Sequence, residues 1–181
     1  MVVLSVEILE KFDIINSYKG GEYMSHNQFI EKYNHISEEF ILGGGYTGIE
    51  LLQAIHIYLF EEECHAGKIR YEEKSSSRKT LADQIKNIWE LNNKEISTTE
   101  YIKKVSLCIA IIYMYQPFYD GNSRTCLILQ NILLKRKGMT LELSPKEEQM
   151  DKRLLAIIYH EQDNQITSTV ERVKQQVKMI R

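Results

Sequence analysis

Residues 116–124 read Gln-Pro-Phe-Tyr-Asp-Gly-Asn-Ser-Arg and separate the most apolar helical pattern in the chain from a second one. The first pattern, Tyr101 to Tyr115, leaves little polar surface, which is typical of a central helix packed on several sides. It must end at Gln116, because Pro117 follows and restricts the backbone of the residue before it. Helical spacing resumes from Thr125 to Lys135. The stretch therefore predicts a tight polar loop between two apolar helices.

Four residues of this loop suit the phosphates of a nucleotide. Gly121 and Asn122 tolerate left-handed backbone conformations, so successive amides can converge on an anion. The helix that begins there adds positive potential. Arg124 opposes the dipole of that helix unless it binds a phosphate, while Asp120 suits a divalent cation that bridges phosphate oxygens. The same residues also fit an ordinary helix–helix turn with Arg124 on the surface, so spacing alone leaves both interpretations open.

Composition places the chain among helical globular proteins. Its 181 residues are 43% hydrophobic and 27% charged, which is enough for one buried core and argues against disorder. Only 2 prolines and 9 glycines occur, too few for the many turns of an all-β fold. The cysteines Cys64, Cys108 and Cys126 stand far apart, so neither a disulfide framework nor a zinc site is expected.

Charge and hydropathy argue against several classes of function. Lys and Arg total 23 and Asp and Glu total 25, giving a net charge of -2. The chain therefore lacks the basic field that nucleic-acid binding needs. No apolar run reaches the roughly 18 residues of a membrane-spanning helix, and no basic segment opens a secretory signal. We expect a soluble protein of a reducing cytoplasm, and the sequence leaves delivery into a host cell open.

Helical spacing predicts a single domain over residues 1–181 with about seven or eight helices. Capping boxes at Thr47 to Glu50 and at Ser97 to Glu100 predict two helix starts. Lys68 to Arg78 is polar and serine-rich, and it predicts a small hairpin or an exposed flap. Besides the two helices around the loop, the predicted helices are Val3 to Tyr18, Ser25 to Gly43, a segment from Thr47, Thr80 to Asn92, Ser144 to His160, and a segment from Ser168.

The loop resembles the signature of Fic-domain proteins, His-Pro-Phe-x-Asp/Glu-Gly-Asn-Gly-Arg-x-x-Arg, with six fixed residues matching between Pro117 and Arg124. Ile55-His56 with Leu59-Phe60, followed by Ala66-Gly67-Lys68-Ile69-Arg70, is similar to the stretch that precedes the family's β-hairpin flap. The resemblance covers about Thr47 to Gly138. It implies an all-α, Fic-like helical domain with one short β-hairpin flap.

The resemblance also implies a function. Most Fic proteins transfer the AMP part of ATP to a Ser, Thr or Tyr hydroxyl of a target protein, with the motif His as base. By position, Asp120 would hold Mg²⁺, Phe118 would anchor the loop, and the target would pair with a flap near Ile69 to Lys79. The residues that would bind the ATP phosphates are Gly121, Asn122, Ser123 and Arg124.

Three positions depart from the family pattern. Gln116 replaces the catalytic His, and an uncharged amide cannot accept a proton at neutral pH. Ser123 replaces the second glycine, and Leu127 replaces the second arginine, which binds the γ-phosphate end. The resemblance therefore implies transfer activity that is weak, altered or absent. The alternative is a catalytically inactive binding or regulatory module, with an antitoxin-like protein or an active Fic homologue as its partner.

Two other histidines, and one serine/threonine-to-glutamate spacing, have roles that the sequence explains without the loop. His56 occupies the family's own position on a packed helix and is expected to be structural. His160 lies near a helix end, where its charge would meet the dipole favourably. Thr167 to Glu171 has the spacing of the family's inhibitory motif, but the capping box Ser168 to Glu171 accounts for it. Tyr119 lies in the loop itself and suits either packing or modification.

Overall fold

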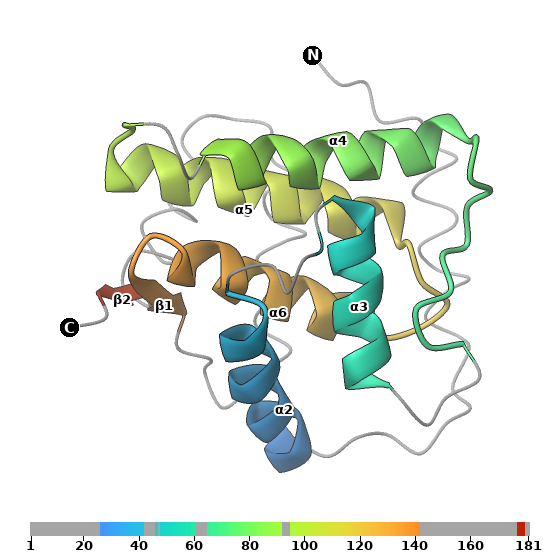
Figure 1. Ribbon diagram of the computed structural model, residues 1–181, viewed down its shortest axis with the longest axis horizontal. Helices are drawn as coiled ribbons and strands as arrows, with labels where there is room; N and C mark the ends of the chain where they lie inside the picture. Colours follow the sequence, from blue (N-terminus) through green and yellow to red (C-terminus); the bar gives the residue numbers. More distant parts are fainter. Residues whose placement is uncertain are drawn as a thin grey trace.

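The computed structural model describes residues 26–41, 46, 48–60, 65–91, 95–141 and 177–179. Within these residues the chain is mostly helical (Figure 1), as the sequence predicts. The elements are α2 (His26–Glu39), α3 (Ile49–Leu59), α4 (Ser76–Leu91), α5 (Thr98–Tyr115), α6 (Asn122–Lys135), β1 (Met139–Leu141) and β2 (Val177–Met179). The two strands pair antiparallel, with Thr140 opposite Lys178. None of the described helices is long and apolar enough to cross a membrane.

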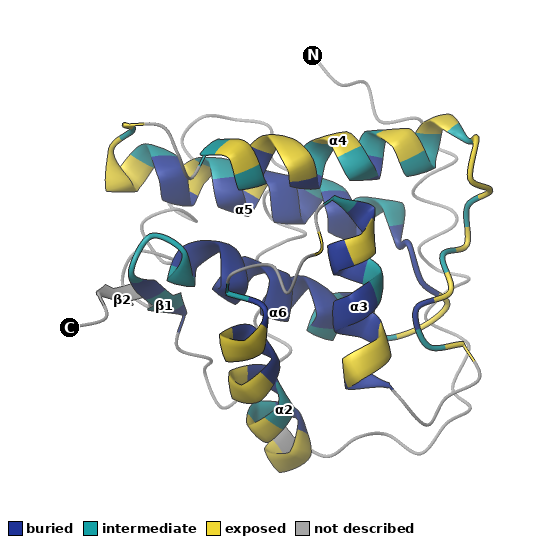
Figure 2. Cartoon of the chain, viewed as in Figure 1, coloured by how far each residue is buried: buried dark blue, intermediate teal, exposed yellow. Residues whose placement is uncertain are grey.

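Helix α6 runs through the middle of the described elements. It contacts α2, α3 and α5 and leads directly into β1, while α4 lies alongside α5 (Figure 1). Figure 2 shows α6 buried along nearly its whole length, whereas α2 and α4 each keep an exposed outer face. The helix predicted to be central, α5, does pack between α4 and α6, but it leaves Leu107 47% exposed. The loop between α5 and α6 therefore leads from a helix packed on two sides into the helix that is buried along nearly its whole length.

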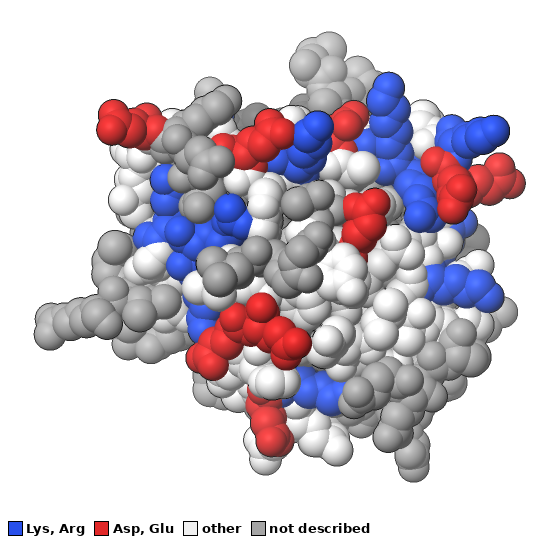
Figure 3. Space-filling view, in the orientation of Figure 1, with Lys and Arg blue, Asp and Glu red and all other residues white. Residues whose placement is uncertain are grey.

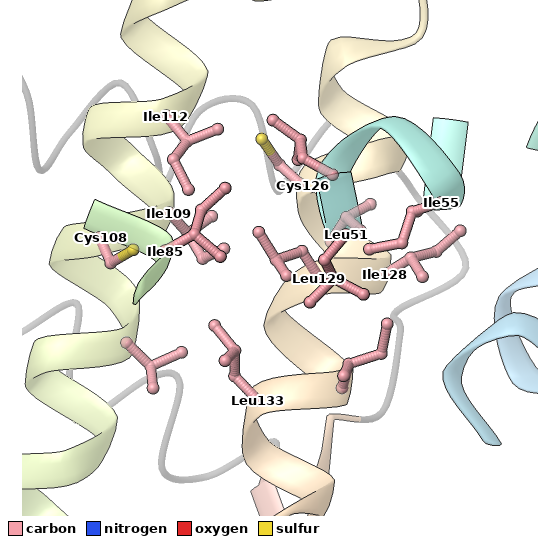
Figure 4. Close-up of a cluster of buried hydrophobic side chains, with 14 of the residues drawn as sticks. Leu51, Ile55, Ile85, Cys108, Ile109, Ile112, Cys126, Ile128, Leu129 and Leu133 are labelled. Carbon is pink, nitrogen blue, oxygen red and sulfur yellow. The ribbon is translucent and has the colours of Figure 1, made fainter. Parts of the chain in front are cut away.

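Branched aliphatic side chains fill the space between the helices. In Figure 4, Ile109 and Ile112 of α5 lie across from Leu129 and Leu133 of α6, and Ile85 of α4 lies beside Ile109. All of these side chains belong to one buried cluster. Full burial of such a side chain contributes about 1.5–3 kcal/mol. The core thus fixes the ends of α5 and α6, and with them the loop that connects them.

The two predicted helix starts have different outcomes. At α5 the predicted cap is confirmed, because the Ser97 hydroxyl accepts a hydrogen bond from the Glu100 amide at 3.2 Å. At α3 the N-cap position is Gly48, one residue later than predicted, and its backbone has φ 63°. Thr47 itself lies outside the described residues. A side-chain oxygen at the cap therefore marks the start of α5 but not that of α3.

The predicted flap is an exposed connection and contains no hairpin. Residues 65–75 form turns, and α4 begins at Ser76, earlier than the predicted Thr80. Ser75 explains the early start, because its hydroxyl accepts a hydrogen bond from the Arg78 amide at 3.2 Å and caps the helix. Within the described ranges, the paired strands are β1 and β2 instead. Of the segment Ile69 to Lys79, only the part before Ser76 is free of helix.

Several predicted elements lie in parts of the chain that the structure does not describe. The helices predicted at Val3 to Tyr18 and Ser144 to His160 lie outside the described residues, as do His160 and the Thr167 to Glu171 spacing. The last helix, predicted from Ser168, does not extend through Val177–Met179, which is strand β2.

On the face shown in Figure 3, acidic and basic side chains are interspersed.

Candidate functional site

The loop between α5 and α6, residues 116–121, is called the Asp120 loop below. Helix α5 ends at Tyr115, and Gln116 is its C-cap with a left-handed backbone, φ 44° and ψ 62°. The Gln116 side chain is 92% buried, at 8% exposure, and its Nε2 donates to the Tyr113 carbonyl at 2.7 Å. The Gln116 amide donates to the same carbonyl at 3.1 Å. Gln116 therefore serves as a helix cap that points back along α5.

Asn122 ties the Asp120 loop to itself. Its Oδ1 accepts from the Phe118 amide at 2.9 Å, and its Nδ2 donates to the Phe118 carbonyl at 2.9 Å. Phe118 has no exposed surface and is part of the core. The Asn122 side chain thus holds both backbone groups of a residue whose ring is anchored inside the protein. This pairing fixes the loop's shape, and it accounts for asparagine at that position.

Gly121 is the N-cap of α6, with φ 68° and ψ 9°. A β-carbon there would lie 2.1 Å from Cε2 of Phe60, so neither the backbone nor the space admits another residue without strain. The Gly121 carbonyl accepts from the Thr125 amide at 3.0 Å and from the Thr125 hydroxyl at 2.9 Å, which closes the first turn of α6. A glycine cap brings no side chain to the amides that follow it. The positive end of the α6 dipole therefore meets the loop here.

Asp120 is exposed and lies beside that helix start. Its Oδ1 accepts from the Gly121 amide at 2.7 Å. Among the described residues, no group of three or more His, Cys, Asp or Glu side chains could hold a metal ion. A single carboxylate nevertheless fits Mg²⁺, which commonly keeps several waters and is held by one or two carboxylates together with substrate phosphates. The donor set therefore fits a magnesium ion that arrives with a nucleotide and not one bound by the protein alone.

Two further predicted residues stand in the first turn of α6. Ser123 and Arg124 are both partly buried there. The Arg124 guanidinium carbon lies 5.3 Å from the ring centroid of Phe29, so the side chain runs along α2. Leu127, one turn further on, is 1% exposed and belongs to the core. The fold thus brings Asp120, Gly121 and Arg124 to one helix end, while the position of the second family arginine faces the interior.

His56 of α3 contacts both the Asp120 loop and a second segment, residues 65–71, called the flap segment below. Its Nε2 lies 3.1 Å from the Asp120 carbonyl, and its Nδ1 accepts from the Gly67 amide at 3.0 Å. The imidazole also stacks on the Phe118 ring, with centroids 3.9 Å apart. Burial lowers the pKa of His56, and the hydrogen bond and charge of Asp120 only partly oppose this. His56 thus has the expected structural role, and it performs that role by joining the Asp120 loop to the flap segment. Sequence spacing could not reveal this, because the two partners of His56 lie 11 and 64 residues away.

Two more hydrogen bonds join the flap segment to the Asp120 loop and to the last residue of α5. The Arg70 amide donates to the Pro117 carbonyl at 2.8 Å, and the Tyr71 hydroxyl donates to the Tyr115 carbonyl. Tyr119 is 57% exposed and lies beside two side chains of this segment. Its ring centroid is 5.8 Å from the Arg70 guanidinium carbon and 5.4 Å from the centroid of the His65 ring. The two segments therefore form one surface next to the start of α6.

The chain is similar to known proteins both in part of its sequence and in its fold. The family description Fic/DOC matches residues 46–134, and no curated protein sequence matches the chain. The fold is similar to that of BepC, a VirB-translocated effector of Bartonella tribocorum solved with bound AMPPNP, at 16% identity and a TM-score of 0.60 over 91% of this chain and 96% of that one.

A second similar structure is the N-terminal Fic domain of a VirB-translocated effector from Bartonella quintana with bound ADP. It has 14% identity and a TM-score of 0.65 over 91% of this chain and 94% of that one. Another structure of a Fic domain from Bartonella quintana has 16% identity and a TM-score of 0.65 over 90% and 91% of the two chains. Likeness at these identities shows a shared fold. The chain belongs to the Fic/DOC family through residues 46–134.

Proposed function

We propose that this chain binds a magnesium nucleotide at the start of α6 and transfers AMP to a protein hydroxyl much more slowly than a Fic domain with histidine at position 116. The observation that carries the proposal is the Asp120 loop itself. Gly121 and Asn122 give it a fixed shape that ends at the positive pole of α6. Two structures with the same fold, from Bartonella tribocorum and Bartonella quintana, hold AMPPNP and ADP.

Different residues of the Asp120 loop and of α6 would bind the phosphates and the magnesium ion. Amides of Gly121, Asn122 and Ser123 would donate to phosphate oxygens, as helix N-termini do in other phosphate sites. Arg124 would turn from its place beside Phe29 toward the same anion. Asp120 would hold Mg²⁺, which neutralises charge between the phosphates. For this, the Asp120 carboxylate must leave the Gly121 amide that it now accepts from.

Transfer requires a base that the loop does not supply. The target's hydroxyl oxygen would form a bond to the α-phosphorus, the bond from that phosphorus to the β-phosphate bridge would break, and pyrophosphate would leave. The hydroxyl proton would pass to solvent water, because Gln116 stands at the position of the family's base. Gln116 is neutral, and its amide nitrogen donates to Tyr113. The loss of general-base help costs about 10²–10⁴-fold in rate.

The target would be a protein segment that lies along the flap segment. The turns of residues 65–71 are already hydrogen-bonded to the Asp120 loop through Arg70 and to the last residue of α5 through Tyr71. A hydroxyl presented there would be next to the start of α6. Because the flap is a short connection and not a hairpin, strand pairing with a target would involve only a few residues.

Labelling with ATP that carries radioactive α-phosphate tests the transfer step. We expect Gln116→His to raise label incorporation into a protein target by at least about 100-fold over the natural chain. Gln116→Asn is the matched control, because it changes the same position without adding a base. If Gln116→His and Gln116→Asn incorporate equal label while both bind nucleotide, the proposed transfer is wrong.

A second candidate function is a binding module without turnover. The capping role of Gln116 and the buried Leu127 favour it, because both positions serve the fold and not the phosphates. In that case the chain would hold a nucleotide, or regulate an active Fic homologue or an antitoxin-like partner. The labelling experiment separates the two functions, since a binding module gains no transfer when only one histidine is restored.

A further inference from the structure

His56 is the point at which the Asp120 loop and the flap segment are connected through one side chain. The two segments are separated in sequence by all of α4 and α5. The imidazole reaches the first through the Asp120 carbonyl and the second through the Gly67 amide, at 3.1 Å and 3.0 Å. The ring is 3% exposed and comes from α3, a helix that is itself packed on α6.

The geometry fixes the tautomer of the ring. A backbone amide can only donate, so Nδ1 must accept from Gly67 and carries no proton. A carbonyl oxygen can only accept, so Nε2 must be the nitrogen that bears the proton and donates to Asp120. The two nitrogens therefore have separate tasks, one for each segment. Neither is available to take a proton from a substrate while both bonds are in place.

The neighbouring rings keep the imidazole in this orientation. Phe118 stacks against it at 3.9 Å with an interplanar angle of 28°, and Phe60 lies at 4.8 Å on α3's end. Phe60 also occupies the space beside Gly121. The imidazole of α3 therefore packs between Phe60, at the end of α3, and Phe118, which belongs to the Asp120 loop.

We propose that His56 is a positioning residue that sets the Asp120 loop for phosphate with Nε2 and sets the flap segment for the target with Nδ1. This rests on the proposed function for the identity of the ligands, but not for the two hydrogen bonds. The role goes beyond packing, because packing alone would not assign one nitrogen to each segment. Substitutions that preserve one bond at a time therefore have separable effects.

Asparagine and glutamine provide those substitutions. In His56→Asn, the δ-oxygen takes the place of Nδ1 and can still accept from Gly67, but nothing reaches Asp120. In His56→Gln, the ε-nitrogen takes the place of Nε2 and can still donate to Asp120, but the acceptor for Gly67 is lost. Gln53→Ala is the control, because it removes a different hydrogen bond to Gly67, the one that the Gln53 side chain donates to the Gly67 carbonyl at 2.9 Å.

ADP affinity reports on the Asp120 loop, and amide hydrogen exchange at Gly67 reports on the flap segment. Calorimetric titration with Mg²⁺ and ADP should show affinity lowered about tenfold in His56→Asn and within about twofold of the natural chain in His56→Gln and Gln53→Ala. Amide hydrogen exchange at Gly67 should show the opposite order, about tenfold faster in His56→Gln and unchanged in His56→Asn. Equal effects of both variants on both readouts would overturn the proposal.

The proposal can fail independently of the proposed function. If the natural chain does not bind ADP, the proposed function is wrong, and exchange at the Phe118 and Gly121 amides then replaces affinity as the readout for the loop. These amides should exchange faster in His56→Asn only. The imidazole nitrogen signals of the natural chain provide a check without any substitution. A proton found on Nδ1 would overturn the assignment of tasks to the two nitrogens.

Discussion

At Gly121 the backbone has φ 68°, and the Phe60 ring occupies the space where a β-carbon would project, 2.1 Å from Cε2. Gly121→Ala must therefore bear both left-handed strain and displacement of a packed ring. We expect it to lower the free energy of unfolding by about 1–3 kcal/mol, as measured by urea denaturation.

Gly138→Ala is the matched control for that substitution. Its backbone has a similar φ of 67°, but nothing lies within 4 Å of the added β-carbon. The difference between the two variants isolates the contact with Phe60. If Gly138→Ala is as destabilising as Gly121→Ala, the close approach of Phe60 to the loop contributes nothing.

His56 also makes stability depend on pH. Burial lowers the pKa of His56 in the folded chain, so the unfolded chain binds more protons below its ordinary pKa of about 6.5. The stabilising contribution is fully present above that value, and it is lost as the pH falls through the window below it. We expect the free energy of unfolding to decline below about pH 6.5.

The comparison with His56→Gln isolates this effect, because glutamine does not titrate. The difference in unfolding free energy between the natural chain and His56→Gln should shrink as the pH falls from 7.5 toward about 5.5. A difference that stays constant over this range would mean that His56 does not resist protonation in the folded chain.

At the scale of elements, the sequence predicts helices where apolar spacing and a local cap agree. The start of α5 at Ser97 and its end at Gln116 were predictable, because a serine oxygen and a following proline act within a few residues. The start of α4 was predicted four residues late. The serine-rich stretch looks like a polar loop, yet Ser75 caps a helix there.

The elements that the sequence does not predict depend on distant partners. Strands β1 and β2 are three residues each, and most of the C-terminal part of the chain separates them in sequence. Neither strand is long enough to show the alternation of apolar and polar residues by which a strand is predicted. The flap segment forms no hairpin because its Arg70 amide bonds to Pro117, far along the chain, and not to a facing strand. Local patterns contain no information on such pairings.

The candidate site was predictable to a similar extent. The loop residues Asp120, Gly121 and Asn122 stand next to one another in sequence, and their placement at a helix start follows from local rules. The resemblance to Fic proteins marks Gln116 as the altered position, but only the structure gives its side chain a use, as the cap on Tyr113. The bridge made by His56 depends on residues from three separate segments and had no signal in the sequence.

At the scale of the whole molecule, helix packing and hydrogen bonds both act on the start of α6. Helix α6 is enclosed by α2, α3 and α5, so the start of that helix has a fixed position relative to the rest of the described protein. The Asp120 loop is bonded to itself through Asn122 and to α3 through His56. The backbone of a phosphate site at this point would need little reorganisation on binding, which favours affinity, and the side chains that would move are those of Asp120 and Arg124.

Calorimetric titration of the natural chain with ADP, in the presence and absence of Mg²⁺, tests the central claim most directly. We expect saturable binding of one ADP per chain with Mg²⁺, and a loss of the magnesium dependence in Asp120→Ala, because Asp120 is the proposed metal ligand. Asp83→Ala, an exposed carboxylate on α4, is the matched control and should bind as the natural chain does. Absence of ADP binding by the folded natural chain, or an unchanged magnesium dependence in Asp120→Ala, would contradict the account.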